Sequence, residues 1–113
     1  MVKNVKSTIF ALSTPEGKSG IAVIRISGEK CLFILEKLCH LKNIEPRVAK
    51  LTKFYNKRSE VIDQGLIIWF NSPLSYTGED MLELHTHGSP AIIKKLMGIL
   101  ISIKKHKNIC LCV

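Results

Sequence analysis

The sequence predicts an α+β fold in which two helices pack on one face of a mixed β-sheet. Five segments rich in β-branched and aromatic residues have the length of strands, and two others repeat apolar residues at helical spacing. Turn residues separate these segments. The predicted order is ββαβββα, followed by the start of another strand. With 113 residues, 46% of them hydrophobic, we expect a single domain over residues 1–113.

The first two predicted strands flank a turn. Residues 7–13 form a short strand that stops at Thr14-Pro15-Glu16-Gly17, where proline and glycine stand in favoured turn positions. Residues 21–27 are almost continuously apolar, so this strand should be central and well buried. Arg25 interrupts the run. An arginine is costly to bury without a partner, which makes Arg25 a candidate functional residue.

A helix and a hairpin are predicted next. We expect Ser27-Gly28-Glu29 to cap the helix and Pro46 to close the segment. The hairpin pairs residues 48–55 with residues 61–70 around a turn at 57–60. The apolar stripe of the helix consists of Cys31, Leu32, Leu35, Leu38 and Cys39.

Residues 81–87 form the most informative predicted strand, because ionisable side chains alternate with apolar ones. Glu83, His85 and His87 occupy every second position, and a strand points such residues to one face. The leucines between them point to the other face. Charged strand faces line pockets or interfaces, but solvated antiparallel sheets also expose charge. A ligand site, a metal site and a solvated face are therefore all open readings.

The second helix begins at Ser89-Pro90, with proline in its first turn, and residues 108–113 begin a further strand. The longest aliphatic run, residues 96–103, is far shorter than the about 20 residues that a bilayer requires, so no membrane span is expected. The apolar stretch near the amino terminus is too short for a secretory signal, and we predict a cytoplasmic protein. The apolar stripe of the helix is Ala91, Ile92, Leu96, Ile99, Leu100 and Ile103.

Net charge and cysteine content limit the classes of partner. The formal net charge of +8 favours an anionic ligand or nucleic acid. The lysines are scattered along the sequence without interleaved aromatic residues, which weakens the prediction of direct nucleic-acid binding. The four cysteines contain no Cys-x-x-Cys pair and are expected to be reduced and structural. They are Cys31, Cys39, Cys110 and Cys112.

Three other patterns give weaker indications of a functional site. Gly17-Lys18-Ser19 matches the end of a phosphate-binding loop, but the earlier glycine and the following helix of that loop are missing. Same-face positions on a strand are about 6.5 to 7 Å apart, so a metal site that uses both Glu83 and His87 is geometrically difficult. Glu79 and Asp80 point to opposite faces if they lie in the strand, which argues against shared acid–base chemistry.

Arg25 and Glu83 together offer two interpretations. A guanidinium and a carboxylate from two central strands can form a buried ion pair with a purely structural role. The same residues can also bind a ligand. Glu83 would then accept hydrogen bonds from the donor edge of a heterocycle, and Arg25 would bind carbonyl or acidic oxygens. The residue types alone leave both interpretations open.

Residues 8–28, 63–70 and 76–88, in this order, closely resemble the amino-terminal domain of the MnmE family of tRNA-modification GTPases, also called TrmE. The resemblance covers most of the chain. It implies a tetrahydrofolate-binding domain, similar in fold to the folate domains of glycine-cleavage aminomethyltransferases, with 5-formyltetrahydrofolate or a related tetrahydrofolate as ligand. It also implies a homodimer in which each subunit contributes a strand to its partner.

By the same resemblance, Arg25 in Ile-Arg-Ile-Ser-Gly and Glu83 in Gly-Glu-Asp-Met-Leu-Glu match the family's folate-binding arginine and glutamate. Glu83 would bind the amino-pyrimidine edge of the pterin. The parent enzymes act with the flavin-dependent protein MnmG, or GidA, on the wobble uridine of tRNA. We expect the helical and GTPase domains to be absent here, which leaves a binding module without a GTP site or catalytic residues.

Two alternatives remain beside the folate module. The first is a small metal-dependent enzyme built on Glu83, His85 and His87. The second is a structural dimerisation domain in which Arg25 and Glu83 pair only with each other.

Overall fold

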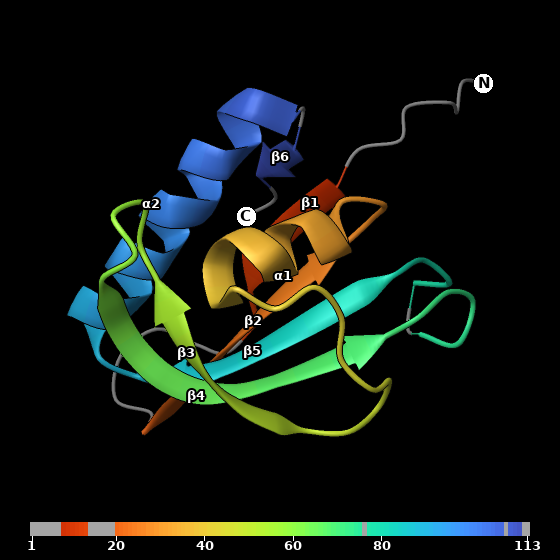
Figure 1. Ribbon diagram of the computed structural model, residues 1–113, viewed down its shortest axis with the longest axis horizontal. Helices are drawn as coiled ribbons and strands as arrows, with labels where there is room; N and C mark the ends of the chain where they lie inside the picture. The colour runs from red at the N-terminus through yellow and green to blue at the C-terminus, as the bar shows by residue number, and fades with distance from the viewer. Residues whose placement is uncertain (1–7, 14–19, 76, 108, 112–113) are drawn as a thin grey trace.

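The computed structural model describes residues 8–13, 20–75, 77–107 and 109–111. The predicted α+β class and the predicted order of elements are confirmed (Figure 1). The elements are β1 (Thr8–Leu12), β2 (Ile21–Ser27), α1 (Cys31–Cys39), β3 (Lys50–Tyr55), β4 (Val61–Phe70), β5 (Met81–His87), α2 (Pro90–Lys107) and β6 (Ile109–Leu111). The turn predicted at Thr14-Pro15-Glu16-Gly17 and the Gly17-Lys18-Ser19 motif lie outside the described residues.

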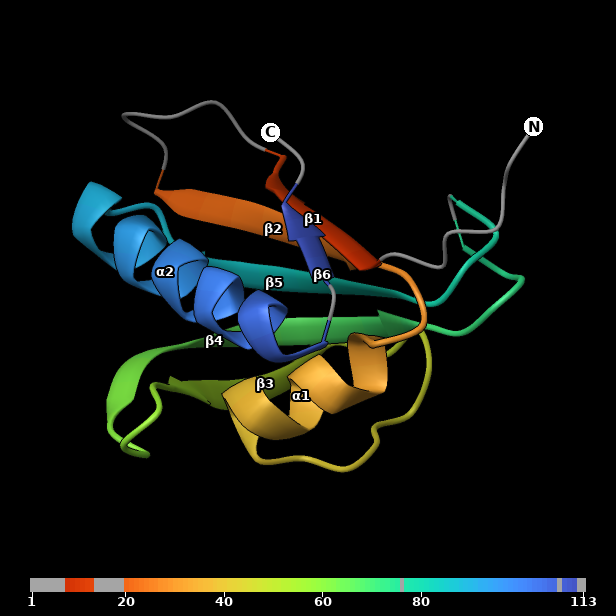
Figure 2. The same ribbon diagram turned by 90° about the horizontal axis from the view of Figure 1, so that it is seen from above.

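The described strands form a six-stranded sheet in the order β3-β4-β5-β2-β1-β6. Four neighbouring pairs are antiparallel and β1 pairs with β6 in parallel, so the sheet is mixed, as predicted. The strands β2 and β5 lie side by side at its centre. Both helices cover the same face of the sheet, which leaves the opposite face, here called the outer face, without a helix (Figures 1 and 2).

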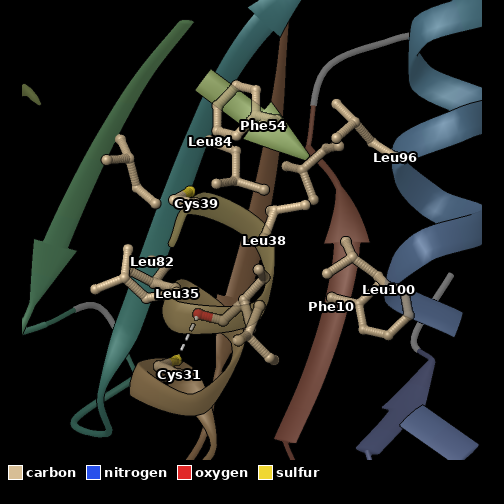
Figure 3. Close-up of a cluster of buried hydrophobic side chains, with 14 of the residues drawn as sticks. Phe10, Cys31, Leu35, Leu38, Cys39, Phe54, Leu82, Leu84, Leu96 and Leu100 are labelled. Atoms are coloured by element: carbon tan, nitrogen blue, oxygen red, sulfur yellow. Dashed lines mark hydrogen bonds between the residues drawn. The ribbon is translucent and has the colours of Figure 1, made fainter. Parts of the chain in front are cut away.

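The core lies between the sheet and the two helices. The leucines of β5 that alternate with its charged residues are fully buried there, as the strand pattern predicts. Figure 3 shows them beside side chains from α1, and side chains from β1 and α2 complete the cluster. Burial of each such side chain contributes roughly 1.5 to 3 kcal/mol. The labelled apolar residues are Phe10, Leu35, Leu38, Phe54, Leu82, Leu84, Leu96 and Leu100.

The start of α1 differs from the prediction. The N-cap residue is Lys30, and its side chain makes no capping hydrogen bond. The Lys30 main-chain N–H donates instead to Thr8 Oγ1 at 2.9 Å. The predicted cap residue Ser27 donates its hydroxyl hydrogen to Glu79 Oε1 at 2.9 Å. The prediction was wrong because the partner comes from β1, which local sequence spacing cannot reveal.

The two cysteines of α1 are buried and carry no disulfide, as predicted for structural thiols. Burial raises the pKa of the Cys31 and Cys39 thiols to about 12, so both stay protonated at neutral pH. The side chains of Cys110 and Cys112 lie outside the described part of the structure. Among the described residues, no helix has the length and apolarity that crossing a membrane would require.

A candidate ligand site on the outer face of the sheet

The strand register brings the two predicted site residues together. In the antiparallel pair β2–β5, Arg25 lies directly opposite Glu83. Both alternate with buried core residues, so their side chains point to the outer face. Arg25 Nε donates to Glu83 Oε2 at 3.0 Å. The prediction that these two residues meet across central strands is confirmed.

The pair is only partly shielded from solvent. The Glu83 side chain is 11% exposed, whereas that of Arg25 is 42% exposed. The ion pair of the structural interpretation is therefore present, with a buried carboxylate and a partly exposed guanidinium. The carboxylate is enclosed, and the guanidinium reaches solvent because neither of the described helices covers this face (Figure 2).

His85 completes the arrangement. Its Nε2 lies 3.1 Å from Glu83 Oε1, so Arg25 and His85 hold one carboxylate oxygen each. The strand pattern placed His85 on the same face as Glu83 and left ligand, metal and solvated-face readings open, but the contact between the two side chains was not predicted. The spacing of two residues predicts the shared face, and two neighbouring side chains on that face are close enough to form this contact.

Apolar residues of the adjacent strands frame this cluster. Ala11 of β1 lies opposite Arg25, and Ile68 of β4 lies opposite Glu83. Together the four residues form a row across the sheet in which a charged pair is bounded by apolar side chains. Apolar walls with a few convergent polar groups are typical of small-molecule sites.

A second cluster of hydrogen-bonded polar side chains lies at the end of the site, where β2 meets the loop before β5. Ser27 Oγ is 2.8 Å from Thr77 Oγ1 and donates to Glu79 Oε1. Asp80, by contrast, accepts a hydrogen bond from the Ser72 main chain. Glu79 and Asp80 both precede β5, so the expectation of opposite strand faces does not apply to them, and they have different hydrogen-bond partners.

His87 is separated from the cluster and pairs with a residue that the sequence analysis did not single out. His87 Nδ1 lies 2.7 Å from Asp63 Oδ1, and its main-chain N–H donates to Asp63 Oδ2 at 3.0 Å. Within the described residues, no group of three metal-ligating side chains is close enough to hold an ion. This geometry disfavours the metal site built on Glu83, His85 and His87.

The contact between Asp63 and His87 should make the free energy of unfolding depend on pH in the acid range. Burial raises the pKa of the Asp63 carboxyl group, but hydrogen bonds from His87 and the Gln64 main chain outweigh it and lower the pKa. A lowered pKa stabilises the fold above the ordinary carboxylate pKa, and that stabilisation is lost as pH falls through the lowered value.

We therefore expect Asp63→Asn to lower the free energy of unfolding by about 1 to 2 kcal/mol at pH 7, a difference that shrinks toward zero in acid. Urea unfolding across pH 2 to 7 measures it, with the exposed Glu45→Gln as the matched control. A difference that is constant with pH would contradict the role of the Asp63 charge.

Comparison with known proteins identifies the family. Residues 8–108 match the family model described as "GTP-binding protein TrmE N-terminus". The chain belongs to the TrmE amino-terminal family. The match includes both strands of the Arg25–Glu83 pair.

Relatives of the TrmE family agree with this assignment. The chain is 50% identical over 91 residues to a tRNA modification GTPase MnmE of Ehrlichia ruminantium (strain Gardel), covering 80% of the chain and 21% of the relative. It is 52% identical over 94 residues to a MnmE of Wolbachia sp. subsp. Drosophila simulans (strain wRi), covering 83% and 21%. A MnmE of Sulfurovum sp. (strain NBC37-1) is 38% identical over 102 residues, covering 90% and 23%. The chain thus spans about a fifth of the length of these relatives.

Proposed function

We propose that the chain is a reduced-folate-binding and homodimerisation module of a tRNA-modification system, with 5-formyltetrahydrofolate or a related tetrahydrofolate as its ligand. The observation that carries the proposal is an enclosed carboxylate, Glu83, held by Arg25 and His85 on the uncovered face of the sheet. In this arrangement Glu83 accepts from the ligand, and Arg25 fixes Glu83 or the polar atoms of the ligand.

The hydrogen-bonding capacity of Glu83 suits a pterin. An ionised carboxylate has about four lone-pair positions, and Arg25 and His85 use one on each oxygen. The remaining positions can accept from the amino group and the ring N–H of an amino-pyrimidine. Because charged acceptors form the stronger hydrogen bonds, such a contact favours ligands with this donor edge.

Stability alone is a weak reason for the Arg25–Glu83 pair. A salt bridge whose arginine is 42% exposed contributes about 0 to 1 kcal/mol to the stability of the fold. The purely structural interpretation therefore leaves the choice of these residues unexplained, whereas ligand binding accounts for it.

Homodimerisation through the outer face is supported by its exposed apolar side chains. Four large ones surround the charged cluster in the strand register. They are Ile9 (38% exposed), Ile21 (59%), Leu51 (62%) and Leu66 (39%). Clustered exposed apolar groups indicate an interaction surface. A second copy of the chain would cover them and shield the folate site from water.

The family assignment supports a proposal for the wider setting. In the full-length parent enzymes, we propose that the module works in the cytoplasm with tRNA and the flavin-dependent protein MnmG. The chain itself has no assigned GTP site or catalytic residue in this proposal, and the chemistry on tRNA belongs to the complete assembly. Its own part is to hold the one-carbon donor.

Calorimetric titration of the 113-residue chain with 5-formyltetrahydrofolate tests the proposal. We expect saturable binding with one ligand per chain, and no binding of GTP under the same conditions. A folded dimer that gives no heat and no thermal stabilisation with the folate would instead favour the structural dimerisation domain.

A further inference from the structure

The helix-covered side of the molecule contains a basic groove that the folate site does not use. Two adjoining hollows of about 910 and 790 Å³ form it, and they share the wall residues Asn56, Lys57, Ile99 and Ser102. Its walls are the end of α1 with the following loop, the turn between β3 and β4, and α2. Figures 1 and 2 both show this turn beside α2.

The fold gathers positive charges here that are dispersed in the sequence. Six cations line the groove, and all are exposed: Lys37, Lys42, Lys57, Arg58, Lys94 and Lys95. Two carboxylates accompany them, and Glu60 accepts a hydrogen bond from Asn56 at 2.7 Å. Within the described part of the chain, none of the six cations forms an ion pair. The groove therefore has a net positive field.

An aromatic surface also lies in this groove, contrary to the sequence expectation. The rings of His40 and Tyr55 stack with centroids 3.9 Å apart and planes 5° from parallel. The His40 side chain is exposed, and both residues line the larger hollow. Single-stranded nucleic acids bind where a positive groove follows the phosphates and a planar ring is available for base stacking.

We infer that this groove binds the phosphodiester backbone of RNA. The charges come from three separate elements and extend along two connected hollows, which suits a strand of several phosphates better than a single compact anion. The relatives are named as tRNA modification proteins, so RNA is the polyanion with which such a chain works. The inference uses the family assignment but does not depend on folate binding.

The groove and the folate site have separate roles because they lie on opposite sides of the sheet. The groove is built on the helix side, whereas Arg25 and Glu83 point to the outer face. RNA held in the groove is therefore anchored away from the one-carbon donor in the same subunit. We expect saturating 5-formyltetrahydrofolate to leave RNA affinity unchanged.

Fluorescence anisotropy with a labelled 12-nucleotide single-stranded RNA tests the inference on the 113-residue chain. The double variant Lys37→Glu, Lys57→Glu reverses two groove charges. The matched control is Lys50→Glu, Lys53→Glu, which changes the net charge equally at exposed positions of β3 outside the groove. Circular dichroism and thermal melting verify that both variants fold.

We expect the groove variant to lose at least about tenfold in RNA affinity at 50 mM salt, with a salt dependence that is weaker by roughly two phosphate contacts. The control should stay within about threefold of the original chain. Equal losses in both variants, or no saturable RNA binding by the unaltered chain, would overturn the inference. Folate binding measured on the same samples separates these outcomes from a failure of the folate proposal.

Discussion

Replacing Glu83 with alanine should weaken binding of 5-formyltetrahydrofolate by roughly a hundredfold or more, and the domain should stay folded. The variant removes the carboxylate that is proposed to accept from the pterin, together with the hydrogen bond that Arg25 Nε donates to it at 3.0 Å. The fold survives because the Arg25 side chain is 42% exposed and water can solvate it. Calorimetric titration measures the affinity, and urea unfolding measures the stability.

Two further variants show whether the loss of folate affinity comes from the missing charge of Glu83 or from a general disturbance of the fold. Glu83→Gln keeps the size of the side chain but removes the charge, and we expect an intermediate loss of affinity. Glu60→Ala removes a carboxylate in the β3–β4 turn. Glu60 lines the basic groove and is not part of the proposed folate site, so this variant should leave folate affinity unchanged. Equal folate affinity in Glu83→Ala and the original chain would refute the assignment of Glu83.

Gly65→Ala should destabilise the sheet strongly. A Cβ at this position would collide with the main-chain oxygen of His85 in the neighbouring strand β5. A backbone atom within a ladder cannot move aside as a flexible side chain can, so β4 and β5 must separate locally. We expect a loss near the upper end of the about 1 to 3 kcal/mol that overpacking costs. Urea unfolding measures the loss.

Gly98→Ala is the matched control for this prediction. Gly98 lies exposed within α2, and a Cβ there meets nothing within 4 Å. Alanine should therefore stabilise the helix by about 0.5 to 1 kcal/mol. Because Gly65→Ala displaces the strand that carries Glu83 and His85, it should also weaken folate binding. Unchanged stability in this variant would contradict the close approach of the two strands.

The elements of the fold could be predicted because their signals are local. The apolar run of residues 21–27 and the alternation in residues 81–87 both correspond to strands with these bounds. The predicted capping residue of α1 was wrong, because the side chain of Thr8 in β1 accepts the hydrogen bond from the Lys30 main-chain N–H at the start of the helix. A contact of this kind depends on tertiary structure, and local patterns do not encode it.

The same distinction applies to the candidate site. Arg25 and Glu83 stood out in the sequence because each carries charge within an apolar strand, and the register places them opposite each other. Asp63 did not stand out, because its partner His87 lies 24 residues away. The basic groove was also missed, since its lysines come from three elements and look scattered until the chain folds.

The most direct test of the proposed folate site is to locate bound 5-formyltetrahydrofolate on the chain. Nuclear Overhauser contacts can be measured between 5-formyltetrahydrofolate and the methyl groups of the isotopically labelled chain. We expect contacts from the pteridine to Val23, Leu66 and Ile68, which flank Arg25, Glu83 and His85 on the outer face. Contacts to Ile99 and Ile103 in the basic groove, with none on the outer face, would contradict a folate site at Arg25 and Glu83.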